Sequence, residues 1–271
     1  MSEALDLSDS GLRWLDLSGR GVSELPPGVE RLQRLEHLSL RGNRFEAIPD
    51  VVWRLPALRS LSLGENPLGE LPEEIGELRG LRELYVHELG LERLPEAIGA
   101  LGELRVLDAG HNRLAALPDA LGSLSRLDVL YVHDNRLGEL PECVTRLGGL
   151  TYLNASANGI ARLPASIGRM AELIELRLLD NHLSELPAEI GDLAHLRELH
   201  LRRNRLTALP EAIAVLRELR LLDLRANGLG RLTAAVAELP RLEKLDLRWN
   251  RLVDPPAWIE GLRERGCVVL L

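Results

Sequence analysis

The chain has 271 residues, of which 45% are hydrophobic, so it is long enough to bury a sizeable core. Its formal net charge of −8 at pH 7 argues against nucleic acid or an anionic membrane as the main partner. Cys143 and Cys267 are the only cysteines, which excludes a disulfide framework and a CxxC-type zinc site.

Two features of the sequence bear on its cellular location. The first residues do not combine a basic region with an apolar run, so no signal peptide is predicted. No apolar stretch reaches the length of about 18 residues that a membrane-spanning helix needs. Since unpaired cysteines suit a reducing compartment, we expect a cytoplasmic protein.

From Leu12 onward the sequence repeats every 23 residues without insertion or deletion. The unit is LxxLxLxxNxLxxLPxxIxxLxx, and eleven units cover residues 12–264. One repeat cannot bury its own apolar face, so neighbouring repeats must stack into a solenoid. The predicted fold is an α/β solenoid that forms one domain, 1–271. It has an N-terminal cap at 1–11 and a C-terminal capping strand at 265–271.

Each part of the repeat has a physical role. The LxL segment alternates inward and outward side chains, which predicts a strand that stacks in parallel on its neighbours. The asparagine, for example Asn204, should form a ladder of hydrogen bonds to backbone groups of the turn. The Leu-Pro step is expected to end the strand. The acid that often follows it, such as Glu73, is expected to begin a short helix, where it suits the helix dipole.

Some repeats depart from this pattern. Arg20 and Leu89 replace the ladder asparagine, Thr233 replaces the proline, and Pro255 replaces the leucine before the proline. Irregular repeats are expected at solenoid ends. Leu89 is internal, so we expect the turn around it to differ from its neighbours.

The segments LPEEIGELRGLRELYV and LPAEIGDLAHLRELHL resemble the leucine-rich-repeat superfamily. More narrowly, they are similar to the intracellular 23-residue class found in Ras-group scaffold proteins and many bacterial proteins. The resemblance covers about nine-tenths of the chain. It implies a right-handed, curved horseshoe with a parallel sheet on its concave face and helical or 3-10 segments on its convex face. It also implies a recognition module that uses the concave face.

Residues that flank the inward leucines of each strand should point to the concave surface. All three tyrosines, two of the four tryptophans and five of the seven histidines fall at such positions. Tyr and Trp recur in the energetic centres of interfaces, although strands also favour aromatic residues. We therefore predict that this face binds a protein or peptide. The candidate contact residues are Tyr85, His87, Val106, Asp108, His111, Val129, Tyr131, His133, Tyr152, Asn154, Arg177, Leu179, His200, Arg202, Arg225, Arg248 and Trp249.

Two zones of this surface stand out. In repeats four to seven, bulky strands alternate with small ones. At about 4.8 Å per strand, Tyr85 and Tyr131 would lie about 10 Å apart across Asp108 and would form a notch. Toward the C-terminus, arginines interleave with acids. They form either self-neutralising ion pairs or a docking site for an acidic or phosphate-bearing segment.

A metal-dependent enzyme is the alternative function. His87, His111 and His133 lie on three successive predicted strands with aspartates close by, and such a set can hold zinc. No spacing motif such as HExxH and no phosphate-binding glycine loop supports this alternative. We predict a non-catalytic chain with no metal and no cofactor, whose partners are neither nucleic acid nor membrane.

Overall fold

The computed structural model describes residues 11–271, and the chain forms two compact units. The first unit ends at Leu127 and the second runs from Asp128 to Leu271. The 23-residue period continues through this boundary. That all repeats form a single domain stays a prediction. Apart from Gly11, the predicted N-terminal cap lies outside the described residues.

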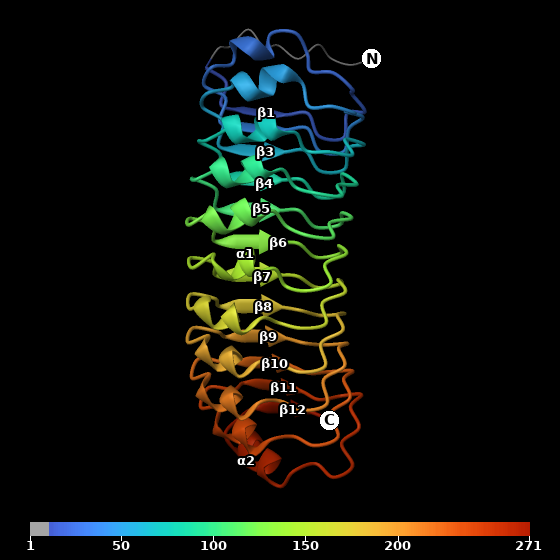
Figure 1. Ribbon diagram of the computed structural model, residues 1–271, viewed down its shortest axis with the longest axis vertical. Helices are drawn as coiled ribbons and strands as arrows, with labels where there is room; N and C mark the ends of the chain where they lie inside the picture. Colours follow the sequence, from blue (N-terminus) through green and yellow to red (C-terminus); the bar gives the residue numbers. More distant parts are fainter. Residues whose placement is uncertain (1–10) are drawn as a thin grey trace. The chain divides into compact units, whose positions relative to one another are not determined.

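Short parallel strands and 3-10 helices alternate along the first unit (Figure 1). Each strand pairs with its neighbour at a register of one repeat, so that Leu15 lies beside Leu38 and Leu84 beside Leu107. The strands are β1 (Trp14–Asp16), β2 (His37–Ser39), β3 (Ser60–Ser62), β4 (Glu83–Tyr85) and β5 (Val106–Asp108). The helices are η1 (Val29–Arg31), η2 (Asp50–Arg54), η3 (Glu73–Glu77), η4 (Glu96–Ala100) and η5 (Asp119–Ser123).

The second unit continues the same alternation and includes two short α-helices. Its strands are β6 (Val129–Tyr131), β7 (Tyr152–Asn154), β8 (Glu175–Arg177), β9 (Glu198–His200), β10 (Leu221–Asp223), β11 (Lys244–Asp246) and β12 (Val268–Leu270). Its helices are α1 (Glu142–Thr145), η6 (Ala165–Arg169), η7 (Ala188–Asp192), η8 (Glu211–Val215), η9 (Ala234–Glu238) and α2 (Trp258–Glu264). Among the described residues, no helix combines the length and the apolarity required to cross a membrane.

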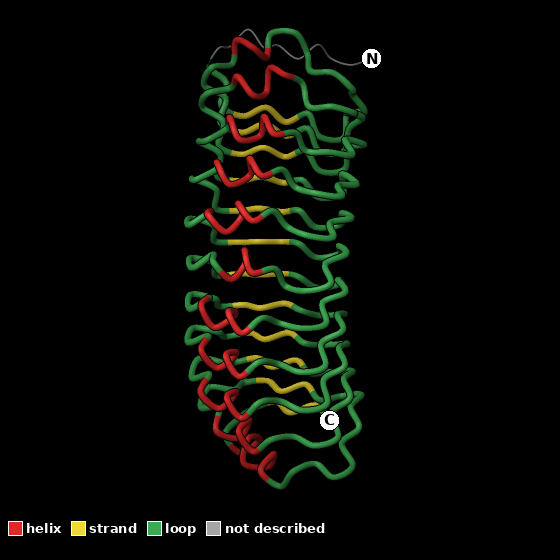
Figure 2. Tube along the Cα trace, in the orientation of Figure 1, coloured by secondary structure: helices red, strands yellow, loops and turns green. Residues whose placement is uncertain are grey.

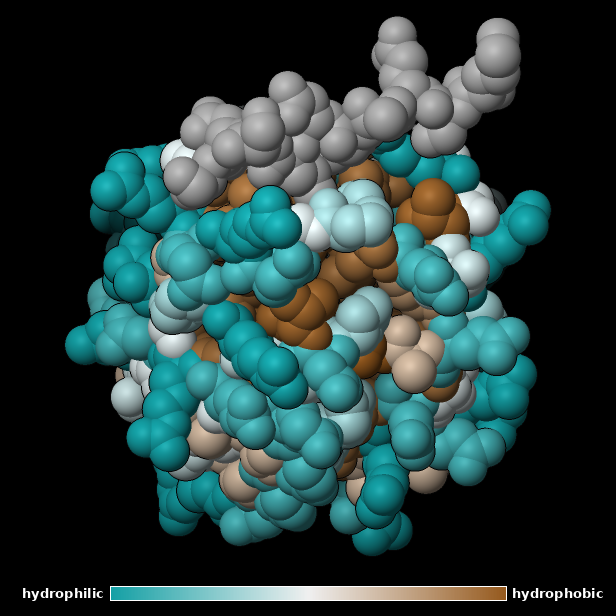
Figure 3. Space-filling model, turned by 90° about the horizontal axis from the view of Figure 1, so that it is seen from above, coloured by the Kyte–Doolittle hydropathy of each residue, from teal (hydrophilic) through white to brown (hydrophobic). Residues whose placement is uncertain are grey.

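The leucines of the repeat form the core of each unit. Each repeat contributes one strand and one helical segment (Figure 2), and the leucines between them are almost fully buried. Leu84 on β4 and Leu153 on β7 are both 0% exposed. In the end-on view, hydrophilic side chains cover most of the periphery (Figure 3). The predicted leucine-rich-repeat solenoid is therefore confirmed, with strands of only three residues each.

The asparagine ladder is confirmed. The Asn204 amide nitrogen donates to the carbonyl oxygens of Leu178 and Leu201 at 2.8 and 3.0 Å, and its Oδ1 accepts the Leu183 N–H at 3.0 Å. The side chain thus satisfies buried backbone groups of its own repeat and of the preceding one. The same pattern is formed by Asn43, Asn66, Asn112, Asn158, Asn181, Asn227 and Asn250.

The turn at Leu89 differs from its neighbours, as expected. Leu89 is buried, and its N–H donates to Oδ1 of Asn112 at 3.2 Å. Gly90 follows with φ of 75°. Arg20 at the other irregular turn is also followed by such a glycine, Gly21, with φ of 67°. At both turns where another residue replaces the ladder asparagine, the next residue is thus a glycine, which adopts the left-handed region readily.

The Leu-Pro step begins the helical segment and does not end the strand. Each strand stops well before it, and the prolines, such as Pro49 and Pro72, directly precede the helices with φ of −61° and −78°. The acids that follow, including Glu73, begin their helices as predicted. Where Thr233 replaces proline, its hydroxyl caps η9 by accepting the Ala235 N–H at 3.1 Å. A fixed φ and a side-chain cap are thus two ways to start the same helix.

Candidate functional site: the outward face of the strands

The outward side chains of the strands, with the residue that follows each strand by two positions, form a surface that we term the strand face of each unit. The predicted contact residues other than His111 and Trp249 lie on it, and all of these are half-buried. Partial burial follows from the strand spacing of about 4.8 Å, at which neighbouring side chains cover one another. These residues therefore form packed surfaces.

His111 and Trp249 were predicted on the strand face but lie in the turns. Their φ angles are 52° and 61°, in the left-handed region. The strands are only three residues long, so this position falls outside them. The equivalent residues with positive φ are Glu65, Glu88, Asp134, Ala157, Asp180, Arg203 and Ala226, and Gly19 and Gly42 occupy the same place in the first repeats.

The predicted central zone divides between the two units. Tyr85, His87, Val106, Asp108 and His111 belong to the first unit, and the candidates from Val129 onward belong to the second. The predicted notch would combine Tyr85 of the first unit with Tyr131 of the second. The predicted histidine–aspartate metal cluster also combines residues of both units. Both therefore stay predictions.

In the first unit, small side chains on β3 leave a hollow that we term the β3 trough. Its floor is formed by Ser60 and Ser62, and its volume is about 360 Å³. On one side lies His37, whose ring stacks on that of Trp14 with centroids 4.5 Å apart. The other wall comes from β4 and the residue two positions after it, namely Glu83, Tyr85 and His87.

Of the trough residues, only Tyr85 and His87 had been predicted as contacts. A signal was present in the sequence, because both outward positions of β3 are serine and Gly64 follows. The flanking strands carry His37 and Tyr85 at outward positions. A strand with small outward side chains between two strands with large ones could have indicated a trough.

His87 is held in a defined place. Its Nδ1 lies 3.3 Å from Oδ2 of Asp108, and only 14% of its side chain is exposed. The adjacent Asp108 carboxylate raises the pKa of His87, an effect that outweighs burial. The imidazole lies over Gly64, where a Cβ atom would stand 2.4 Å from Nε2. Gly64 therefore makes room for the His87 ring.

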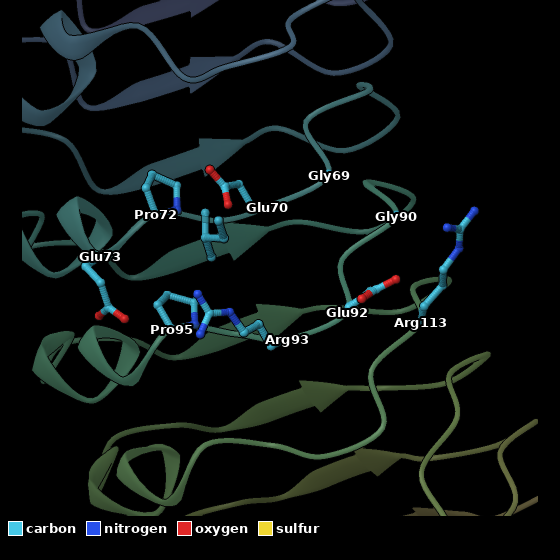
Figure 4. A pocket seen from close by; sticks show the side chains of 10 residues that line it. Gly69, Glu70, Pro72, Glu73, Gly90, Glu92, Arg93, Pro95 and Arg113 are labelled. Atoms are coloured by element: carbon cyan, nitrogen blue, oxygen red, sulfur yellow. The ribbon is translucent and has the colours of Figure 1, made fainter.

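Another hollow in the first unit lies among the loops, away from the strand face (Figure 4). It has a volume of about 440 Å³ and includes Glu70, Glu92, Arg93 and Arg113 in its lining. The Glu73 carboxylate beside it accepts the Ala97 N–H at 2.9 Å, which links two consecutive helices. None of the predicted contact residues lines this hollow, so we assign it no binding role.

In the second unit, Tyr131, Tyr152 and Arg177 form a continuous surface that we term the Tyr–Arg patch. The two tyrosine rings have centroids 5.0 Å apart, and the Arg177 Cζ lies 5.9 Å from the centroid of Tyr152. Burial raises the pKa of Tyr152 to about 12, so its phenol stays neutral at physiological pH. Arg177 also bonds to Glu175, which fixes its guanidinium beside the ring.

Arg202, Arg225 and Arg248 occupy equivalent positions after β9, β10 and β11, and we term them the arginine row. Arg248 binds Asp246 through two hydrogen bonds, which lower the pKa of the Asp246 carboxyl despite its burial. Arg225 lies 4.0 Å from an oxygen of Asp223, and its Cζ lies 5.6 Å from the Trp249 ring centroid.

Arg202 differs from the rest of the arginine row. Within residues 11–271, its guanidinium makes no hydrogen bond or ion pair, and its Nε is buried without a partner. The predicted ion pair thus forms at Arg248, and the docking site stays a prediction. Arg248 is paired with a carboxylate of its own chain, whereas Arg202 has capacity for an external one.

Glu175, Glu198 and His200 are the described residues of the second unit whose ligand atoms could surround a metal ion. These atoms lie within 4.8 Å of one another. All three side chains already have polar partners. His200 Nε2 lies 2.9 Å from Glu198 Oε2, and Arg177 bonds to Glu175. Arg177 thus competes with any cation for the Glu175 carboxylate.

The sequence and the fold match leucine-rich-repeat proteins. One family model, described as a leucine-rich repeat region, matches residues 98–188, and another, described as leucine rich repeat, matches 10–68, 171–229 and 194–252. A leucine-rich-repeat protein of Leptospira interrogans shares 33% identity at a TM-score of 0.95, covering 99% of this chain and 68% of that one. Comparison with curated proteins found no match.

Two further solved structures are also similar. The structure of PEPR1–AtPEP1 shares 32% identity at a TM-score of 0.82 over 98% of this chain. The plant peptide hormone receptor RGFR1 in complex with RGF2 shares 29% identity at a TM-score of 0.79 over 96% of this chain. This chain spans 39% and 47% of their respective lengths. Repeat pattern, strand register and family matches agree, and the chain therefore belongs to the leucine-rich repeat family.

Proposed function

We propose that this chain is a non-catalytic recognition module that binds a protein or peptide through its strand faces. The observation that carries the proposal is the Tyr–Arg patch. Tyr131 and Tyr152 point away from the leucine core, so the core does not require them. Two adjacent aromatic rings beside a fixed guanidinium are typical of interface centres, which are rich in Tyr and Arg.

The partner proposed for the second unit carries an acidic segment. Arg202 has no partner within residues 11–271, and Arg225 has only a distant carboxylate at 4.0 Å. A carboxylate of the partner would pair with the half-buried Arg202 guanidinium, which has no anionic partner within residues 11–271. Arg248 would stay with Asp246.

A similar peptide hormone receptor supports the peptide class of partner. Two of the structures that match this chain at about 30% identity are PEPR1–AtPEP1 and the plant peptide hormone receptor RGFR1 in complex with RGF2. This chain covers less than half of each of them, so we transfer only the class of ligand and no contact residue.

The test compares partner recovery by three proteins. The wild-type chain is used to capture partners from a lysate of its own cells, beside the double variant Tyr131→Ala, Tyr152→Ala and the variant Val215→Ala. Val215 is a matched control, because it is an apolar side chain 53% exposed on η8, outside the strand face. Loss of a central tyrosine should weaken binding by about thirtyfold, or roughly 2 kcal/mol, for a hot spot.

The controls separate binding from folding. Circular dichroism of the tyrosine variant should match the wild type, because neither ring enters the core. If the tyrosine variant keeps the partner and Val215→Ala loses it, the assigned face is wrong. For a purified partner, Arg202→Gln should reduce affinity and its salt dependence. Unchanged salt dependence would remove the acidic segment from the proposal.

The metal-dependent alternative has its own test. We expect no stoichiometric transition metal in the purified chain, because the Glu175 and Glu198 carboxylates already contact Arg177 and His200. Elemental analysis that found about one zinc per chain would contradict this expectation. Its loss in His111→Ala or in His200→Ala would then show which histidine binds it and favour the enzyme alternative.

A further inference from the structure

We propose that the β3 trough of the first unit binds a guanidinium group, supplied by an arginine side chain of a partner protein. The proposal adds a ligand class opposite in charge to the acidic segment proposed for the second unit. It concerns residues of the first unit alone, so it does not depend on the Tyr–Arg patch or the arginine row.

The unsatisfied charge of the trough is negative. Within residues 11–271, the Glu83 carboxylate makes no hydrogen bond or ion pair, although Glu83 is half-buried. Asp16 also lines the trough, and a hydrogen bond from Ser18 lowers the pKa of its carboxyl, which keeps it ionised. The cations nearby are engaged, since Arg41 bonds to Glu65 and His87 contacts Asp108.

The floor of the trough offers acceptors for N–H groups. Ser60 and Ser62 are half-buried, and neither hydroxyl has a hydrogen-bond partner in the part of the chain that the structure describes. Ser39 differs, because its hydroxyl lies 2.6 Å from that of Ser18. A guanidinium carries five N–H donors and no acceptor, so the Glu83 carboxylate and two free hydroxyls match it well.

The walls of the trough suit a flat cation. Trp14 is 60% exposed and stacks on His37, and Tyr85 stands on the other side of β3. His37 and Glu83 sit on β2 and β4, each one strand from β3, so the opening spans about 10 Å between their backbones. Aromatic faces attract a planar guanidinium placed between them.

Other occupants fit less well. An acidic group would meet Glu83 and Asp16, and the cations that could neutralise it are already paired. A purely apolar side chain would leave the Glu83 carboxylate and the serine hydroxyls desolvated without partners. A neutral ligand of the same shape would bind the serine hydroxyls but would not neutralise the Glu83 carboxylate. It should therefore bind more weakly than a guanidinium, and this difference in affinity can be measured.

The experiment titrates the full chain with three small probes, followed by the NMR signal of the Trp14 indole N–H. The probes are N-acetyl-arginine amide, its neutral counterpart N-acetyl-citrulline amide, and N-acetyl-glutamate amide. The Trp14→Phe variant assigns the signal. We expect the arginine probe to shift it and the citrulline probe to bind at least about tenfold more weakly, which corresponds to a lost charge-assisted hydrogen bond.

Three variants locate the binding group. Glu83→Gln should weaken binding of the arginine probe by about tenfold, because one charged contact is lost. Glu77→Gln, at an exposed acid on η3, removes the same charge outside the trough and should change nothing. Ser62→Leu should fill the trough and abolish binding. Because Ser62→Leu adds bulk without removing charge, the two trough variants test different properties.

Several results would overturn the proposal. They are equal binding of the citrulline probe, preference for the glutamate probe, equal effects of Glu83→Gln and Glu77→Gln, and no Trp14 shift up to the solubility limit of the arginine probe. Thermal melting of each variant accompanies the titrations. If Glu83→Gln does not fold, Ser62→Leu and the comparison of arginine with citrulline on the wild type still decide the outcome.

Discussion

The strand faces of the two units differ in how their polar groups are satisfied, although the leucine cores behind them are alike. In the first unit, β3 presents only serines, and the Glu83 carboxylate beside them has no partner within the described residues. In the second unit, the rings of Tyr131 and Tyr152 fill the face, and Arg177 is bonded to Glu175. The same repeat thus carries a different surface in each unit, because the core fixes only the inward positions of each strand.

The largest expected effect tests whether the two cores are equivalent. Leu84→Ala in the first unit and Leu153→Ala in the second should each cost about 2–5 kcal/mol, because both side chains are 0% exposed and truncation leaves a cavity. Urea unfolding gives the cost, and hydrogen exchange should show weakening near the altered repeat first. A cost below 1 kcal/mol in one unit alone would mean that the cores differ.

The next effect concerns the ladder beside the irregular turn. Asn112→Ala should cost about 2–4 kcal/mol, because buried backbone groups that include the Val86 carbonyl and the Leu89 N–H lose their partner. Asn135→Ala is the comparison variant, because the repeat of Asn135 and the repeat before it both contain the ladder asparagine. If Asn112→Ala were harmless by thermal melting, the turn at Leu89 would not depend on the ladder.

A smaller effect probes the contact between Gly64 and His87. Gly64→Ala should cost about 1–2 kcal/mol, since a Cβ there would meet the imidazole at 2.4 Å and displace it. In the His87→Ala background the same substitution should cost almost nothing, and this double-mutant cycle is the check. An unchanged cost in that background would place the strain elsewhere in the turn.

The smallest effect is a dependence of stability on pH. Asp108 raises the pKa of His87 in the folded chain, so the added stability is present below the unfolded pKa of about 6.5. It is lost as the pH rises through the higher folded pKa. The stability difference between wild type and Asp108→Asn should therefore shrink from about pH 5.5 to pH 8, by less than about 1 kcal/mol for this partly exposed pair. Urea unfolding at both pH values measures it, and a difference that grew with pH would contradict the assignment.

Much of the scaffold followed from the sequence because each rule acts within one repeat or between adjacent repeats. The 23-residue period predicted the parallel register, seen where Leu15 pairs with Leu38. The asparagines predicted the ladder, and the acid at Glu73 predicted where a helix begins. The outward orientation of Tyr152 followed from its place beside Leu153, since strand side chains alternate.

Only the tertiary structure decided which outward groups have partners. The sequence shows Arg41, Arg202 and Glu83 alike as charged side chains at outward positions, yet Arg41 is paired and the other two have no partner within residues 11–271. Pairing depends on rotamers and on side chains of the next repeat, which a one-dimensional pattern does not specify. The left-handed φ of Trp249 likewise depends on where a three-residue strand ends. The period set the backbone, because burying leucine dominates the energy, whereas weaker side-chain contacts set the surface.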